Sequence, residues 1–155
     1  MRSWFLLLVR LFYLSAISCQ LISCSSSKTT SAKFFRDTIP IVSFCDLPQF
    51  KGKQVYLRCY YSGIEEYWSL KDIEKKNCSP KLRIDLQFAG KNPFLVPKKF
   101  EKAFSDVRDN YYNSFLLIEA IGMFENDNKS GYGHLGSNNA RFIISELVKA
   151  EVIRK

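Results

Sequence analysis

Hydrophobic and polar residues alternate most regularly over residues 81–88. Because successive side chains of a β-strand point to opposite faces, the alternation predicts a strand with one face in the core. The predicted core face carries Leu82, Ile84, Leu86 and Phe88. Residues 53–61 alternate in the same way and predict an earlier strand whose core face includes Cys59.

One amphipathic helix is predicted after these strands. Its apolar residues recur at the spacing of one helix face, and Pro97 suits its first turn. The stripe consists of Phe100, Ala103, Phe104 and Val107.

The other elements follow from weaker patterns. The stretch at 43–53 predicts a short turn of helix that ends at Gly52, and residues 66–72 predict a short strand after a turn. Residues 114–124 are apolar almost throughout and predict a central strand in which Gly122 marks a bulge. A last strand is predicted from Arg141 onward, and a helix over residues 145–155 is the alternative on propensity.

The predicted order is three strands, a helix and two further strands. This order matches the OB-fold, a five-stranded, partly open Greek-key barrel with a helix between strands 3 and 4. We therefore expect a mainly β fold with one helix, placed at residues 39–155. A chain of 155 residues with 46% hydrophobic residues is long enough to bury a core of this kind.

The first 23 residues differ in character from the rest. They carry Arg2 and Arg10 but no acidic residue, and an apolar run fills residues 11–17. This pattern predicts a secretory signal peptide, and the run is too short for a comfortable membrane span. An uncleaved anchor is the alternative.

The end of that segment, "LISC" at residues 21–24, resembles the lipobox of bacterial lipoproteins. The resemblance implies that Cys24 becomes the first mature residue and carries fatty acyl chains such as palmitate. "AISC", which ends at Cys19, fits the pattern less well. Residues 24–38 are rich in serine and threonine and predict a polar tether. Ordinary secretion, with cleavage merely near Cys24, is the alternative.

The net charge favours an anionic partner without identifying it. The formal charge of +8 becomes 8 − 2 = +6 once residues 1–23 are removed. A charge of this size suits nucleic acid, anionic lipid or an acidic glycan.

Three cysteines follow Cys24, and an exported domain favours a disulfide. Cys59 shares a strand face with Val55 and Leu57, which predicts a buried free thiol. Cys45 and Cys78 lie in turn-like contexts, so we predict that these two pair, although three pairings are possible. No Cys-x-x-Cys is present and the single histidine has no nearby cysteine, so no metal site is expected.

The segment "GYGHLG" at residues 131–136 has the glycine spacing of a dinucleotide-binding loop. That fingerprint requires a strand directly before it and a helix directly after it. Here the flanking patterns predict strands, and only 155 − 136 = 19 residues follow. We therefore expect no cofactor. The segment predicts a loop between the last two strands, with Tyr132 and Leu135 packed over the barrel end and His134 in a structural role.

Aromatic and basic residues of the strands suggest a ligand face. OB-folds present their second and third strands to oligonucleotides or oligosaccharides. Export makes nucleic acid an unlikely physiological ligand, and a glycan, a peptide or an envelope protein is expected instead. The candidate residues are Tyr56, Arg58, Tyr60, Trp68 and Arg83.

Several short motifs resemble a group of small exported bacterial OB-like domains. They are the Cys-Asp-Leu at 45–47, the Gly-Lys-x-Val at 52–55 and the Gly-Tyr-Gly-His at 131–134. The resemblance covers residues 42–148, supports the pairing of Cys45 with Cys78, and implies no particular biochemical activity. Cys59 and the "SNNAR" after Gly136 depart from the family pattern.

The sequence thus predicts a non-catalytic lipoprotein of the bacterial cell envelope, held in the membrane by its N-terminal lipid. Ser25, in place of aspartate, resembles outer-membrane sorting if the host has two membranes. The alternative is a secreted soluble OB-domain that binds a glycan or a polyanion. An enzyme that uses His134 ranks third, because no nucleophile with a recognisable signature accompanies this histidine.

Overall fold

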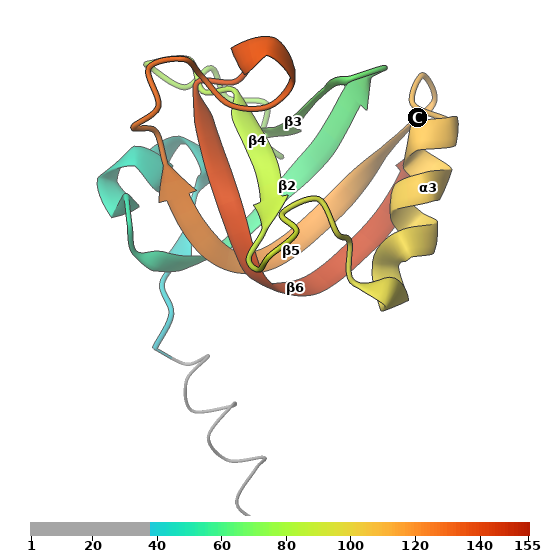
Figure 1. The fold of residues 1–155 in the computed structure, drawn as a ribbon, viewed down its shortest axis with the longest axis horizontal. Coiled ribbons are helices and arrows are strands. Elements are labelled where there is room, and N and C mark those ends of the chain that lie inside the picture. The colour runs from blue at the N-terminus through green and yellow to red at the C-terminus, as the bar shows by residue number, and fades with distance from the viewer. Residues whose placement is uncertain (1–37) are drawn as a thin grey trace, which may run out of the picture. The chain divides into compact units, whose positions relative to one another are not determined.

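Five strands close into a barrel in the computed structural model, which describes residues 38–155 (Figure 1). The predicted signal peptide, Cys24 and the tether up to residue 37 lie outside the described residues. The barrel strands are β2 (Gln54–Ile64), β3 (Tyr67–Lys71), β4 (Ile84–Phe88), β5 (Ser114–Glu125) and β6 (Ala140–Arg154).

The order around the barrel is β2-β3-β4-β6-β5, and β5 pairs again with β2 to close it. β4 and β6 run parallel, whereas the other barrel pairs are antiparallel. The helix α3 (Glu101–Asp109) lies between β4 and β5. This arrangement confirms the predicted OB-like barrel with its helix between the third and fourth barrel strands.

A short strand and a 3₁₀ helix precede the barrel. β1 (Ile41–Val42) pairs in parallel with the first half of β2, and η1 (Phe44–Phe50) follows it directly. η1 is the predicted short helical turn, and the chain turns at Gly52 with a φ of +70° before β2 begins. Ile39–Lys155 form one compact unit.

The residues that the alternation predicted to be buried form part of the core. Val55, Leu57 and Cys59 of β2 are at most 1% exposed, and the apolar residues of β4 are buried as well. β5 pairs with β2 on one side and β6 on the other, which explains why nearly all its residues are apolar. At Gly122 the β5–β6 register shifts, as the predicted bulge requires.

α3 covers the barrel through the predicted apolar stripe. Phe104 and Val107 are buried, and Phe100 and Ala103 are partly buried against the same core. Burial of a side chain of this size contributes about 1.5–3 kcal/mol, so these two residues account for most of the attachment of the helix. A 3₁₀ turn, η2 (Lys98–Phe100), precedes α3 after Pro97.

Two strand boundaries differ from the predicted ones. β2 continues past Tyr61 to Ile64, so the turn into β3 is confined to Glu65 and Glu66. Gly63 allows this close pairing, because a Cβ there would lie 2.4 Å from the carbonyl oxygen of Tyr67. β4 begins at Ile84 rather than at residue 81, because residues 81–83 bond to the loop before β6 instead of to a strand.

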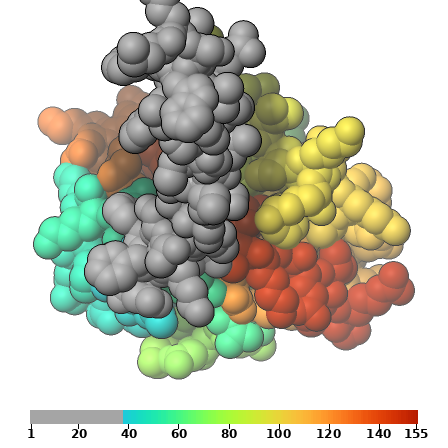
Figure 2. Space-filling view, turned by 90° about the horizontal axis from the view of Figure 1, so that it is seen from below, coloured from blue at the N-terminus to red at the C-terminus, as the bar shows by residue number. Residues whose placement is uncertain are grey.

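The segment that contains η1 and the segment that leads into α3 lie on different sides of the barrel. Figures 1 and 2 both place the teal segment that includes η1 on the side opposite the yellow segment that leads into α3. Among residues 38–155, no helix has the length and apolar character needed to cross a membrane.

Candidate ligand-binding pocket

A cavity of about 880 Å³ opens over β3, β4 and the loop 126–139, which joins β5 to β6. We call it the β3–β4 pocket; its walls include Tyr61, Glu66, Trp68, Asp85, Gln87, Phe94, Glu125, Asp127, Tyr132, His134 and Arg141. Figure 1 shows this loop, drawn in orange with its short helical turn, at the same end of the barrel as β3 and β4. An OB-fold binds its ligands over strands 2 and 3, between the first hairpin loop and the last loop. The β3–β4 pocket occupies that position.

The three glycines of "GYGHLG" shape this loop. Gly131, Gly133 and Gly136 have φ values of +79°, +70° and +67°, which side chains rarely adopt. A Cβ on Gly131 would lie 2.3 Å from the carbonyl oxygen of Gly136. A Cβ on Gly133 would lie 3.2 Å from Oδ1 of Asp85, at the pocket wall. The glycines therefore allow the loop to fold tightly on itself and onto β4.

Tyr132 and Asn138 clamp the loop at its base. The backbone N–H of Tyr132 donates to the carbonyl of Asn138 at 2.8 Å, and that of Asn138 donates back at 3.0 Å. Nδ2 of the buried Asn138 also donates to the carbonyl of Trp68 at 3.2 Å, which ties the loop to β3. The hydroxyl of Tyr132 accepts from the backbone N–H of Asn128 at 3.0 Å. The loop is thereby pre-organised, which lowers the entropic cost of binding.

Asn139 attaches the same loop to the segment before β4. Its Oδ1 accepts from the backbone N–H of Arg83 at 2.8 Å, and its Nδ2 donates to the carbonyl of Lys81 at 2.8 Å. Asn138 and Asn139 belong to the "SNNAR" segment, which the sequence presented only as a departure from a family pattern. In the structure these two residues hold the loop in place.

His134 connects the two loops that flank the pocket. Its Nδ1 lies 3.0 Å from Oε2 of Glu66 in the β2–β3 turn, and its ring meets the Tyr67 ring edge-on at 5.2 Å. Tyr132 is buried, as predicted. The prediction that Leu135 packs over the barrel end is wrong, because its side chain is 84% exposed. With a φ of +49°, Leu135 sits at the outer bend of the loop, and Tyr132 alone reaches the core side.

Aromatic side chains form one wall of the pocket. The rings of Tyr61 and Trp68 lie 5.1 Å apart, and Nε1 of Trp68 donates to the carbonyl of Glu65 at 2.6 Å. Phe94, on the loop before η2, also lines the pocket and is 74% exposed. Flat, partly exposed rings of this kind suit stacking against a sugar ring or a planar side chain.

Polar side chains form another part of the pocket lining through one connected network. Arg141 donates to Oε2 of Glu125 from Nε at 2.9 Å and from Nη2 at 2.7 Å. Its Nη1 donates to Oε1 of Gln87 at 3.1 Å, and the guanidinium stacks over the Tyr132 ring at 5.2 Å. Two nitrogens donate to one carboxylate oxygen and a third donates to Gln87, so these bonds together fix the orientation of the guanidinium.

Asp85 completes the polar wall. Its Oδ2 accepts from Nε2 of Gln87 at 3.0 Å. Burial raises the pKa of the Asp85 carboxyl above its ordinary value, while hydrogen bonds from Gln87 and the Leu86 backbone and the Arg141 charge oppose the rise. A partly desolvated carboxylate of this kind is a strong acceptor for a donor that a ligand brings.

The five predicted ligand-face residues do not come together in one site. Tyr56 donates from its hydroxyl to Oε2 of Glu119 at 2.6 Å, and Nε of Arg58 lies 3.4 Å from Oε1 of the same carboxylate. The Tyr60 ring packs against Phe115 at 4.5 Å. These three residues therefore contact β5. Trp68 lines the β3–β4 pocket, whereas Arg83 lines a second, separate cavity.

The sequence reasoning missed Asp85, Gln87 and Arg141. Asp85 and Gln87 do appear in the sequence as the polar positions of the strand at 81–88, but nothing in the alternation separates a pocket residue from a solvated one. Parallel pairing places Asp85 beside Arg141 across β4 and β6. That pairing depends on the barrel topology and not on local sequence.

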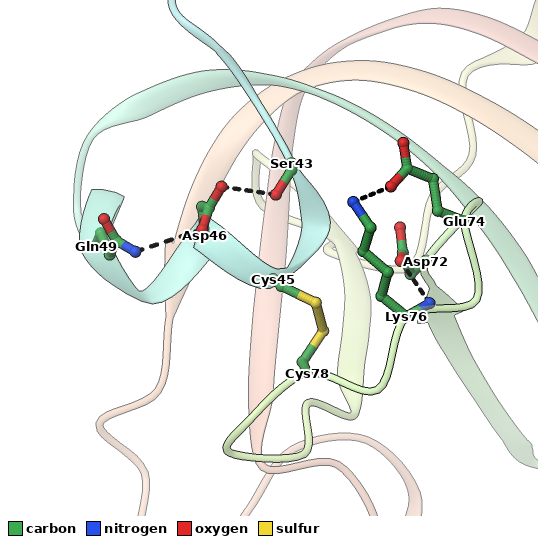
Figure 3. The surroundings of a disulfide bond; sticks show 8 residues. All are labelled: Ser43, Cys45, Asp46, Gln49, Asp72, Glu74, Lys76 and Cys78. Carbon is green, nitrogen blue, oxygen red and sulfur yellow. Dashed lines mark hydrogen bonds and ion pairs between the residues drawn. A yellow bond between two sulfur atoms is a disulfide. The ribbon is translucent and has the colours of Figure 1, made fainter.

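The second cavity, of about 600 Å³, lies beside the disulfide. Cys45 of η1 and Cys78 of the β3–β4 connection form that bond, which confirms the predicted pair (Figure 3). Cys59 is free and buried, also as predicted, and burial raises the pKa of its thiol. Within residues 38–155, no cluster of three or more histidine, cysteine or acidic side chains has a geometry suited to a metal ion.

The comparisons with known proteins identify no relative. No protein-family model matches the chain, and neither a curated protein nor a solved structure does. The resemblance to small exported OB-like domains remains a prediction from the motifs.

Proposed function

We propose that the chain is a non-catalytic lipoprotein of the bacterial cell envelope whose OB-like domain binds a glycan or a peptide in the β3–β4 pocket. One observation carries the binding role: a preformed pocket lies over the strands and loops with which OB-folds bind their ligands. The anchoring role is supported by the "LISC" motif and the tether of residues 24–38.

The chemistry of the pocket favours a ligand rich in hydrogen-bond donors. Trp68 and Phe94 offer ring faces, and the carboxylates of Glu66, Asp85 and Glu125 offer acceptors. A sugar can stack on the rings and donate from its hydroxyls to the carboxylates. A peptide with amino and guanidinium groups can do the same. A polyanion would bring its charges close to these carboxylates, so the alternative of a polyanion-binding domain does not suit this pocket.

We propose no reaction at this pocket. His134 is paired with Glu66, and the residues that line the pocket include no serine, threonine or cysteine that it would activate. A turnover that His134→Ala abolishes would contradict this part of the proposal.

The binding role is tested by the fluorescence of Trp68. The chain has two tryptophans, so Trp4→Phe leaves Trp68 as the sole reporter in the full chain. We expect its emission to change saturably with cell-wall glycan fragments or with a lysine-rich peptide. Asp85→Asn should weaken the apparent affinity about tenfold, because it removes a charged acceptor.

Glu119→Gln is the matched control for this experiment. It also removes one carboxylate, but Glu119 pairs with Tyr56 and Arg58 and does not line the pocket. The affinity should stay within about twofold, as expected of a remote surface change. Equal losses in the two variants, or no saturable change with either ligand, would refute binding in the pocket.

The anchoring role is tested by metabolic labelling with a fatty acid. We expect the label to be incorporated by the full chain and lost in Cys24→Ala. Cys19→Ala is the control and should keep the label, because "AISC" fits the lipobox less well. Label that persists in Cys24→Ala would refute lipidation at this residue. Absence of label from the unmodified chain would instead favour the secreted soluble alternative.

A further inference from the structure

The cavity beside the disulfide has a charge opposite to that of the β3–β4 pocket. We call it the basic groove; the cations that line it are Lys71, Lys75, Lys76, Lys81 and Arg83. Asp72 is the only acidic residue among its lining residues. Lys71 ends β3, and the other four come from the connection 72–83 that leads to β4.

Most of these charges have no acidic partner. Lys76 pairs with Glu74, and Asp72 accepts from the backbone N–H of Lys76 at 2.9 Å (Figure 3). Among residues 38–155, no carboxylate lies within ion-pair distance of Lys71, Lys75, Lys81 or Arg83. By contrast, Arg58 and Arg141 each contact a carboxylate. The groove therefore offers unpaired positive charge from one continuous segment of chain.

The fold holds the backbone that carries these charges at two points. Cys78 ties the connection to η1, and Asn139 fixes the backbone at Lys81 and Arg83. Attachment of the backbone limits the positions that these exposed side chains can reach, which lowers the entropy lost on binding an anionic surface. The groove thus combines exposed basic side chains with a backbone that the fold anchors.

The groove also lies close to the start of the domain along the chain. Phe44, the first residue of η1, lines it and follows the first residue of the compact unit, Ile39, by five positions. Counted from Cys24, the proposed lipidated residue, only 44 − 24 = 20 positions separate the anchor from the groove. An extended chain spans at most about 3.6 Å per residue, so 20 residues reach at most about 70 Å.

We propose that the basic groove binds the phosphate headgroups of anionic phospholipids in the membrane that carries the anchor. Lysine and arginine clusters next to a membrane anchor are attracted to anionic lipid, and a basic patch adds a second attachment to acyl chains. The choice of lipid over a soluble anion rests on the proposed lipidation of Cys24. The surface charge itself does not depend on that proposal.

Amine footprinting of the full chain on vesicles tests the assignment. The protein is mixed with vesicles of phosphatidylglycerol and phosphatidylcholine, or of phosphatidylcholine alone, and treated with a water-soluble acetylating reagent. We expect acetylation of Lys71, Lys75 and Lys81 to fall at least about threefold on the anionic vesicles and to recover in 0.5 M salt, where charge interactions are screened. Lys98, Lys99 and Lys102, on η2 and α3, are internal controls and should change less than about 1.5-fold.

A pair of charge-matched variants supplies the second measurement. One replaces Lys71, Lys75, Lys81 and Arg83 with glutamine, and the other replaces Lys98, Lys99, Lys102 and Arg108. Neither η2 nor α3 contributes to the groove, so only the first variant should lose affinity for anionic vesicles, by about tenfold or more in sedimentation. Equal losses in both variants would show attraction by net charge alone and would overturn the proposal.

Three further outcomes bear on the source of the anion and on the two proposals. Protection of the groove lysines by heparin but not by anionic vesicles would overturn the lipid assignment and indicate a soluble polyanion. A chain that incorporates no fatty-acid label would contradict the lipidation of Cys24 but not the basic groove. The footprint on added vesicles does not depend on the label. Protection that persists on neutral vesicles would also overturn the proposal.

Discussion

Gly131 and Gly52 differ in how much room their surroundings leave for a side chain. Both have positive φ, at +79° and +70°. A Cβ on Gly52 would meet nothing within 4 Å, whereas one on Gly131 would meet the backbone of Gly136 and Asn138. The glycines of "GYGHLG" are therefore required by close backbone packing as well as by conformation.

Gly131→Ala should destabilise the domain far more than Gly52→Ala. The Gly52 variant pays only for the left-handed backbone, about 1–2 kcal/mol in unfolding free energy. The Gly131 variant must also displace a loop, which adds about 1–3 kcal/mol. Urea unfolding of the two variants measures the difference. Equal losses would mean that the loop relaxes freely around the new side chain.

Cys59 should make the unfolding free energy fall as the pH rises above 9. Burial raises its folded-state pKa above the ordinary 9.0, and the nearby charge of Asp72 acts in the same direction. Below pH 9 the thiol is neutral in both states. Above it the unfolded thiol ionises while the folded one stays neutral, so the unfolding free energy should fall by about 1 kcal/mol between pH 9 and 10.

Cys59→Ala should remove this part of the pH dependence while lowering stability at every pH through the cavity it leaves. Denaturant unfolding at pH 8, 9 and 10 measures it. Burial also raises the pKa of Tyr61, whose ordinary value is 10.0. The measurements therefore stop at pH 10, above which Tyr61 would add its own pH dependence. An unchanged slope in the variant would assign the effect to another group.

At the scale of elements, the disulfide determines how the long connection before β4 is held. Residues 72–83 contain no helix or strand, and Cys78 joins them to η1 across a separation of 33 residues. Asn139 holds the end of the same segment. The basic groove depends on both attachments.

Replacing Cys45 and Cys78 with alanine should lower the unfolding free energy by about 3–4 kcal/mol, because the unfolded chain regains the entropy of a closed loop. Dithiothreitol should lower the denaturation midpoint of the unmodified protein to that of the double variant, and should leave the variant itself unchanged. A midpoint that does not respond to the reductant would show that the bond contributes little to stability.

Periodicity predicted which faces are buried, whereas the ends of β2 and β4, which depend on strand pairing, differ from the predicted ones. The alternation at 53–61 and the stripe from Phe100 to Val107 each report one buried face, and both are found. The extension of β2 to Ile64 depends on Gly63 packing against Tyr67 and Trp68, a contact made only when the hairpin forms. Local pattern carries no signal for it.

At the scale of the whole molecule, two surfaces of opposite charge are separated. The β3–β4 pocket gathers carboxylates within a chain of formal charge +8, while the basic groove gathers unpaired cations. Net charge alone had favoured an anionic partner for the whole domain. Our proposals place the anionic partner at the basic groove and a donor-rich ligand at the β3–β4 pocket.

The compact unit Ile39–Lys155 predicts the outcome of limited proteolysis. A protease should cut near Ile39 and leave the barrel with its disulfide as a stable fragment. Compact domains resist cleavage, whereas the chain at a domain boundary is more readily cut. Mass spectrometry of the first products identifies the cut. Earlier cleavage within 89–97, the long loop before η2, would place the least stable segment inside the domain instead.

The sequence by itself determined the fold class, the helix, the central strand, the buried thiol and the nature of "GYGHLG" as a loop. These features follow from periodicity, from turn residues and from the lengths of the segments, all of which are local. Only the tertiary structure decided where the candidate ligand-face residues lie. Strand pairing sends Tyr56, Arg58 and Tyr60 toward β5, places Arg83 in the basic groove, and brings Asp85 beside Arg141. The distinction between a solvated side chain and a pocket wall depends on neighbours that are distant in sequence, so barrel closure alone settles it.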